Sequence, residues 1–186
     1  FNLAKMFQDG TGGQKNLEEC AKWMTQAAEK GHIEAQHQLG HLYENGNGVD
    51  KDPVKAFEWW FKAAEQGNNP SRGHVSNCYD DGDGVKKNPA KSVFWAQKAA
   101  EAGYPIMQHF LGIRYLKGRD VEKDVEKGLI WLNKAAEQGS AKAQYELGTV
   151  YASDQYGVKN LQQAYFWLSL VKDKSAEAKK ALTEVG

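Results

Sequence analysis

The chain has 186 residues, of which 41% are hydrophobic and 26% charged, a composition typical of an ordinary folded protein and not of a disordered one. Lysine and arginine together number 24, as do aspartate and glutamate, so the formal net charge is zero. Nucleic-acid-binding proteins usually carry a basic excess or a basic stripe, and this sequence has neither. Its purely apolar runs are far shorter than the roughly 20 residues that span a bilayer. We therefore expect no nucleic-acid partner and no membrane insertion.

Tryptophan recurs along the chain at a fixed step of 36 residues, at Trp23, Trp59, Trp95, Trp131 and Trp167. Two glycine series keep the same step, Gly10, Gly46, Gly82 and Gly118, and Gly31, Gly67, Gly103 and Gly139. Fixed self-similarity at a period of about 20–50 residues is the signature of stacked repeats. One repeat cannot bury its apolar surface alone, so the repeats must pack on one another.

The copy from Ala35 to Gly67 shows what each repeat contains. Its first half spaces apolar residues for one face of a helix that ends at Gly46, since glycine readily adopts the left-handed conformation that ends helices. Asp52 then stands before Pro53, the arrangement of an N-cap followed by a first-turn proline. A second helix with the tryptophans on its buried side follows. The equivalent cap residues of the five copies are Asn16, Asp52, Asn88, Asp124 and Asn160.

These patterns predict an all-α fold of helix–turn–helix repeats. We expect a single repeat domain over 1–186, in which the first repeat is truncated and a helix closes the C-terminal end. The chain begins at Phe1, without a methionine and inside a predicted helix, so we expect that a segment precedes it. The predicted repeats are 1–31, 32–67, 68–103, 104–139 and 140–174, and the predicted capping helix covers 175–186.

The segments Leu39–Gly67 and Leu111–Gly139 share a series of motifs in the same order. Each begins with the pair LG, continues with a tyrosine and then a tryptophan in the predicted second helix, and ends with KAAEQG. In these positions the chain resembles the Sel-1-like repeat family over essentially its whole length. The resemblance implies a right-handed α/α superhelix, a solenoid similar to tetratricopeptide arrays. It also implies a non-enzymatic scaffold or adaptor for a protein or peptide partner, without cofactors, as in many bacterial members. We expect a monomer; a periplasmic or secreted location is slightly favoured over the cytoplasm.

One cysteine-rich branch of that family carries a disulfide in every repeat and is linked to β-lactam binding or hydrolysis, which is the alternative function. This chain has only Cys20 and Cys78, on non-equivalent repeat positions. A bridge requires Cα atoms within about 7 Å. We therefore expect two free thiols and neither the disulfide framework nor the β-lactam activity.

Two groups of residues invite a metal interpretation. His37 and His41 are four residues apart on a predicted helix, a spacing that can place two imidazoles on one metal ion. No cysteine or carboxylate lies near them at ligand spacing, so we expect solvated or groove-lining side chains and no metal. The acidic run Asp80–Gly84 resembles a calcium loop but lacks the glutamate at the twelfth position, and it aligns with an interhelical turn.

The five copies also serve as their own alignment, because packing positions repeat whereas recognition positions vary. By analogy with tetratricopeptide arrays, the first helices of the repeats line the concave face. We expect a partner to bind there, as an extended peptide or a helix; binding at a rim or on the convex face is the alternative. The predicted partner-binding residues are His37, His41, Asn77, Asp80, His109, Ile113, Leu116, Tyr145 and Thr149.

Overall fold

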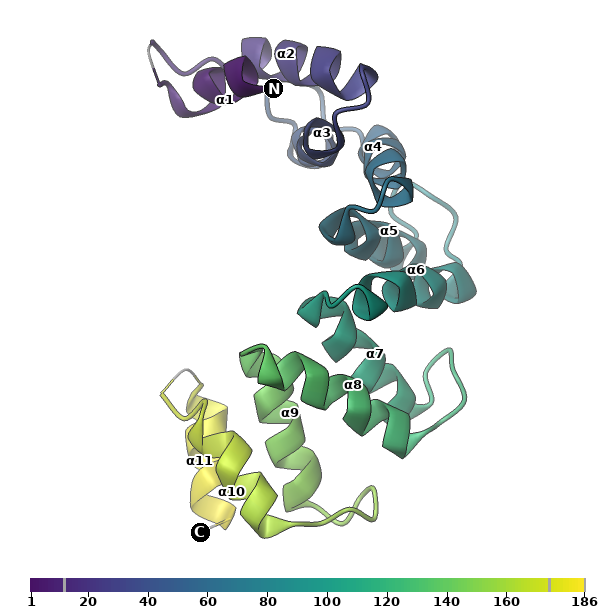
Figure 1. The fold of residues 1–186 in the computed structure, drawn as a ribbon, viewed down its shortest axis with the longest axis vertical. Helices are drawn as coiled ribbons and strands as arrows, with labels where there is room; N and C mark the ends of the chain where they lie inside the picture. The colour runs from purple at the N-terminus through teal and green to yellow at the C-terminus, as the bar shows by residue number, and fades with distance from the viewer. Residues whose placement is uncertain (12, 174, 186) are drawn as a thin grey trace. The chain divides into compact units, whose positions relative to one another are not determined.

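The computed structural model describes residues 1–11, 13–173 and 175–185, and within them it contains helices and no strand. The all-α prediction is thus confirmed for this part of the chain. The helices are α1 (Asn2–Asp9), α2 (Leu17–Glu29), α3 (Ile33–Asn45), α4 (Pro53–Glu65), α5 (Asn69–Asp81), α6 (Pro89–Glu101), α7 (Pro105–Lys117), α8 (Val125–Glu137), α9 (Ala141–Ala152), α10 (Leu161–Ser169) and α11 (Ala176–Val185) (Figure 1).

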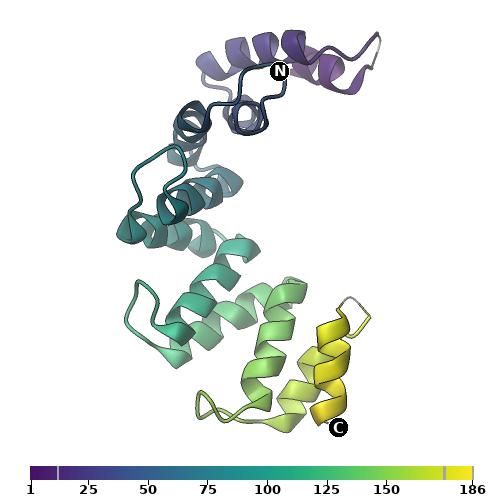
Figure 2. The same cartoon turned by 180° about the vertical axis from the view of Figure 1, so that it is seen from behind.

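The helices form two compact units, Phe1–Lys98 and Ala99–Gly186, with the boundary inside α6. Within each unit a helix packs against the next one along the chain, as the views from the front and from behind show (Figure 1 and Figure 2). The first unit buries one cluster around Met24 and Leu39 and another around Trp60 and Val75. The second unit buries clusters around Leu147 and around Leu168. Each unit therefore has a core of its own.

The predicted caps are present at the ends of the helices. The side chains of Asn16, Asp52, Asn88, Asp124 and Asn160 each accept a hydrogen bond from the backbone N–H three residues later, at 2.9–3.1 Å. Gly10, Gly46, Gly82 and Gly118 end the first helices of four repeats in the left-handed conformation, with φ between 66° and 85°. These residues confirm the predicted positions of the interhelical turns.

A helical glycine sets how closely the two helices of a repeat approach. A Cβ atom added to Gly40 would lie 2.3 Å from the indole nitrogen of Trp60. The equivalent Gly112 and Gly148 face Leu132 and Leu168, with added Cβ atoms 2.6 and 2.5 Å from the leucine Cγ. Real Cβ atoms are not found at such distances, so only glycine fits these three positions.

The third repeat keeps this packing with smaller partners. Its glycine position holds Ser76, whose hydroxyl donates a hydrogen bond to the carbonyl oxygen of Ser92 at 2.9 Å. The position equivalent to Trp60 holds Ala96, which is fully buried. Compared with Gly40 and Trp60 of the second repeat, the third repeat thus has a larger residue on its first helix and a smaller one on its second helix. Ser76 is a buried and hydrogen-bonded residue of a full-length helix.

The tryptophan series is only in part the core that its period suggested. Trp95 and Trp167 are buried, whereas Trp23, Trp59 and Trp131 are half-buried. In the second repeat the neighbouring Trp60 is the core residue, 3% exposed, and the ammonium of Lys62 lies 3.9 Å from the ring centre of Trp59. Trp59 covers the edge of the core, and a cation covers Trp59.

A buried polar contact links successive repeats and was not predicted. The side-chain amides of Gln36, Gln108 and Gln144 donate to the carbonyl oxygens of Ala28, Ala100 and Ala136 at 3.0–3.1 Å. Arg72 makes the equivalent bond to Ala64 at 3.2 Å. These carbonyls belong to the last turn of a second helix, and each also accepts from the backbone N–H of the glycine three residues later. The contact fixes the first helix of one repeat to the end of the preceding one.

The last helix, α11, packs through Ala178 against Leu168 and Val171 of the preceding segment, while Lys179 and Lys180 face solvent. Gly186, the end of the predicted capping segment, lies outside the described residues. The helix α11 thus has one apolar and one polar face, which suits a helix that closes the end of a stack of repeats. This capping role stays a prediction.

Replacing Gly112 by Ala should destabilise the chain by about 1–3 kcal/mol, because the added methyl overpacks the contact with Leu132. In an unconstrained helix the same change would stabilise by about 1 kcal/mol, so the sign of the effect is diagnostic. Urea unfolding followed by circular dichroism measures it. Gln162→Ala, at an exposed position of α10, should stay within about 0.5 kcal/mol of the parent. A stabilised Gly112→Ala variant would refute the close approach.

Truncating Trp60 to Ala should lower the free energy of unfolding by about 3–5 kcal/mol, the range for a large aromatic side chain removed from a core. Trp59→Ala should cost no more than about 2 kcal/mol, because this ring is only half-buried. The same unfolding measurement compares these adjacent residues directly. Equal losses, or a larger loss at Trp59, would contradict the assignment of Trp60 as the core residue.

Candidate partner-binding site

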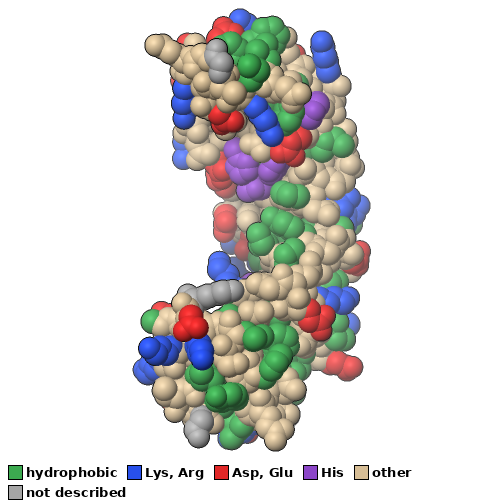
Figure 3. Space-filling view, turned by 60° about the vertical axis from the view of Figure 1, so that its left-hand side comes forward, with side chains coloured by type: hydrophobic (Ala, Val, Ile, Leu, Met, Phe, Trp, Pro, Cys, Tyr) green, Lys and Arg blue, Asp and Glu red, His purple; other side chains and the backbone are tan. Residues whose placement is uncertain are grey.

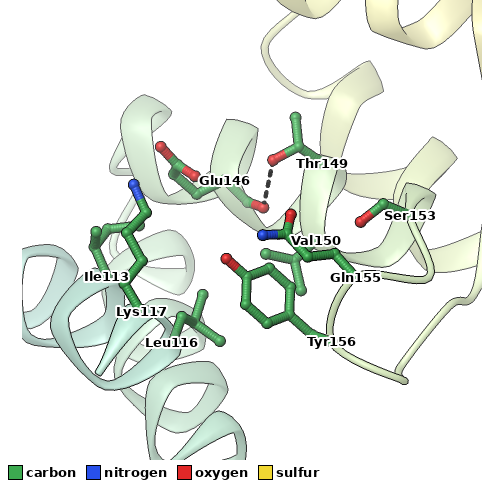
Figure 4. Close-up of a pocket in the computed structure, with 9 residues that line it drawn as sticks. All are labelled: Ile113, Leu116, Lys117, Glu146, Thr149, Val150, Ser153, Gln155 and Tyr156. Carbon is green, nitrogen blue, oxygen red and sulfur yellow. Dashed lines mark hydrogen bonds between the residues drawn. The ribbon is translucent and has the colours of Figure 1, made fainter. Parts of the chain in front are cut away.

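A groove of about 430 Å³ lies between α7 and α9 in the second unit (Figure 4). Both helices are the first helices of their repeats. The segment that follows α9 closes one end. The groove is lined by Ile113, Leu116, Lys117, Glu146, Thr149, Val150, Ser153, Gln155 and Tyr156.

The groove combines an apolar floor with polar and charged groups. Leu116 and Val150 are buried in the core below it, and Ile113 packs on the same core from the side. Burial raises the pKa of the Glu146 carboxyl, and the nearby Lys117 ammonium opposes that shift. Figure 4 shows the Lys117 and Glu146 side chains next to each other above the floor. An apolar side chain could enter this groove while its backbone meets the polar groups.

Three of the predicted partner-binding residues, Ile113, Leu116 and Thr149, line this groove. Leu116 is only 1% exposed and lies against Gly128, so it is chiefly a core residue that also forms the floor. Thr149 is half-buried and donates its hydroxyl to the carbonyl oxygen of Glu146 at 2.9 Å. The structure thus places these residues at one site, and their contact with a partner stays a prediction.

Two further predicted residues of the second unit do not line the groove. Tyr145 packs against the cluster of Leu168 and Val171. His109 is half-buried, and its Nε2 has no hydrogen-bond partner among the described residues. Burial, and then the Lys142 ammonium, lower the pKa of His109.

The predicted residues of the first unit fall in a separate group. Asn77 is exposed and Asp80 is half-buried on α5. His37 is buried, at 8% exposure, and His41 is half-buried. His37 is therefore not a solvated side chain, and its Nδ1 lies 2.8 Å from the hydroxyl of Ser71; the alternative, that it lines a groove, stays a prediction.

His74 is the residue that the sequence reading missed. It lies on α5 beside His37 and His41, with ring centres 5.6 and 4.7 Å away. Its repeat position differs by one from that of His37, so an alignment by repeat period does not bring the two together. One signal was available, because four of the five histidines of the chain lie between residues 32 and 74.

Burial and neighbouring imidazoles lower the pKa of His37 and of His74. Burial, and then the imidazoles of His41 and His37, lower the pKa of His74 to about 4. Burial, followed by His41, also lowers the pKa of His37, an effect that Glu34 partly opposes. Near neutral pH both rings are therefore uncharged, with a lone pair on one nitrogen of each.

Pairs of antiparallel helices repeated every 36 residues, with a glycine at the close approach in three of the repeats, define an α/α repeat protein. A model of the Sel1 repeat matches residues 1–32, 33–68, 73–104, 105–140 and 141–170. The chain belongs to the Sel1 repeat family. Proteins of this family generally act as interaction scaffolds and not as enzymes. No curated protein sequence matches the chain.

Solved structures agree with this assignment. A Sel1 repeat protein from Oxalobacter formigenes is 36% identical, with a TM-score of 0.85 over 94% of this chain and 71% of that one. A protective antigen of uropathogenic Escherichia coli with the same fold is 31% identical, with a TM-score of 0.68, and 99% of this chain covers 48% of it. The chain therefore spans about half of that antigen's length. These matches confirm the predicted fold class, an α/α solenoid.

Cysteine-rich protein B of Helicobacter pylori shares the fold at 22% identity, with a TM-score of 0.55 over 69% of this chain and 92% of that one. In the present chain Cys20 and Cys78 are both buried and free, as predicted.

None of the described helices is both long and apolar enough to cross a membrane.

The two thiols should be unreactive in the folded chain. Burial, and then nearby carboxylates of which Asp83 is the first, raise the pKa of Cys78 to about 12, and burial also raises the pKa of Cys20. Because the thiolate is the nucleophile, iodoacetamide at pH 8 should modify neither thiol without denaturant and both in its presence. Mass spectrometry counts the modified sites. Rapid alkylation of the native chain, or a bridge between the two cysteines, would contradict the assignment.

Proposed function

We propose that this protein is a non-enzymatic scaffold that binds an extended segment of a protein partner in the groove between α7 and α9. The observation that carries the proposal is the lining of that groove, with an apolar floor below charged and amide groups. Family membership supports the role of an interaction scaffold, and the groove is the proposed binding site. The proposal covers the second unit alone, because the groove lies entirely within it.

An extended peptide suits this lining better than a small rigid ligand does. A peptide can insert one apolar side chain over Leu116 and Val150, while its backbone amides reach the polar side chains of the lining. Glu146 and Lys117 offer one acceptor and one donor of opposite charge, which would orient the peptide. A β-lactam ligand, the alternative taken from the cysteine-rich branch, loses support because both cysteines are free.

The test begins with peptides selected from a displayed library on the purified chain, followed by affinity measurement with variants. Ile113→Glu should weaken binding at least about 10-fold, or about 1.4 kcal/mol, because it puts a charge at the apolar wall. Thr149→Arg should act similarly by filling the groove without removing a core residue. Ile130→Glu is the matched control, since Ile130 is 48% exposed on α8, outside the groove.

Circular dichroism of each variant separates lost binding from lost folding. If the two groove variants bind as the parent does while Ile130→Glu loses affinity, the second-helix surface binds the partner and the proposal is wrong.

A further inference from the structure

Three histidine side chains of the first unit converge at the surface between α3 and α5. His37 and His41 come from α3 and His74 from α5, and one potential ligand nitrogen of each lies within 4.8 Å of the others. Histidine side chains form a patch that is visible at the surface in Figure 3, with acidic side chains beside it. This group is distinct from the groove of the second unit.

The rings are held in place from below by Trp60. The indole stacks on His74, with ring centres 4.3 Å apart and planes 13° from parallel, and it meets His41 edge-on at 5.3 Å. The indole N–H also donates to the backbone carbonyl oxygen of His37 at 3.2 Å. Gly40 lies against the same indole, so the close packing of the repeat fixes the floor on which the three imidazoles stand.

Two of the rings have a hydrogen-bond partner on Nδ1. Nδ1 of His37 lies 2.8 Å from the buried hydroxyl of Ser71, and Nδ1 of His41 lies 3.1 Å from a carboxylate oxygen of Glu44. Metal-binding histidines usually donate their second N–H to such a group, which fixes the ring and makes the other nitrogen more basic. These contacts leave Nε2 of His37 and of His41 for a ligand.

We propose that His37, His41 and His74 together bind one divalent transition-metal ion of the Zn²⁺ class. Neutral imidazole is the ligand form that such ions prefer, and three histidines leave a fourth position for water or a partner's side chain. Nitrogens around a tetrahedral Zn²⁺, each at about 2.0–2.1 Å, are roughly 3.3 Å apart. The present separations are up to 4.8 Å, so the nitrogens must approach one another by about 1.5 Å at most to share one ion.

Electrostatics around the cluster also favour a cation. The Glu44 carboxylate lies 3.1 Å from Nδ1 of His41, and the Glu34 carboxylate interacts electrostatically with His37. A hard cation such as Ca²⁺ prefers oxygen ligands and should not occupy this site.

The experiment uses the untagged chain, because a polyhistidine tag would itself bind metal. Calorimetric titration with Zn²⁺ should give one site per chain, and Co²⁺ should give the visible absorption of a nitrogen-rich tetrahedral complex. His41→Gln and His74→Gln should each weaken Zn²⁺ binding by at least about 100-fold, and Glu44→Gln by about 10-fold. Ca²⁺ and Mg²⁺ should give no signal.

His32→Asn is the matched control. It removes a histidine of the same unit outside the cluster, and asparagine can still cap α3 as the His32 ring does. This variant should bind Zn²⁺ like the parent. Circular dichroism checks that all variants fold, which the half-exposed positions of His41 and His74 favour. Equal affinities of the cluster variants and the control, or no binding by the parent, would overturn the proposal.

Discussion

The close approach of the two helices within each repeat is the constraint on which the rest of the structure depends. It requires a residue without a side chain on the first helix, at Gly40, Gly112 and Gly148, opposite a large side chain on the second. Tight interdigitation of this kind brings the helices near enough to exclude water from the pair. It also leaves the opposite side of every first helix without a partner inside its own repeat.

Both proposed binding surfaces rest on residues that take part in this packing. In the first unit the histidine cluster stands on Trp60, the residue that fills the space left by Gly40. In the second unit the groove floor is Leu116, which lies against Gly128 of the second helix. Positions with a packing role are therefore restricted in size, while their neighbours one turn away are free to carry imidazoles in one repeat and apolar or acidic groups in another.

The sequence predicts the repeats, turns and caps well because each depends on residues close together in the chain. Asp52 caps a helix that begins at the next residue, and Gly46 ends the helix before it. The choice between Trp59 and Trp60 as the core residue depends on packing across the repeat, and the regular period favoured the wrong member of the pair. Gln36, Gln108 and Gln144 do recur at multiples of the period, so the buried contact between repeats was detectable from the sequence.

The candidate site was less predictable, because it depends on which residues of successive repeats meet. Ile113 and Thr149, which occupy equivalent positions in adjacent repeats, both line the groove. The residue one period after His37 is Gly73, so His74 lies one residue beyond the equivalent position. Only the structure shows that α5 places His74 against α3. A pair of histidines on one helix indicated little by itself; the third ring and the contacts of Ser71 and Glu44 changed the interpretation.

The central claim is that residue sizes on the two helices of a repeat are matched, and a double-mutant cycle tests it most directly. Gly40→Ser and Trp60→Ala, made singly and together, bring into the second repeat the small pair that the third repeat has at Ser76 and Ala96. The free energy of unfolding from urea titration should be higher in the double variant than the sum of the single losses predicts, by more than about 1 kcal/mol. Losses that add to within about 0.5 kcal/mol would show that the two positions do not depend on each other and would contradict the claim.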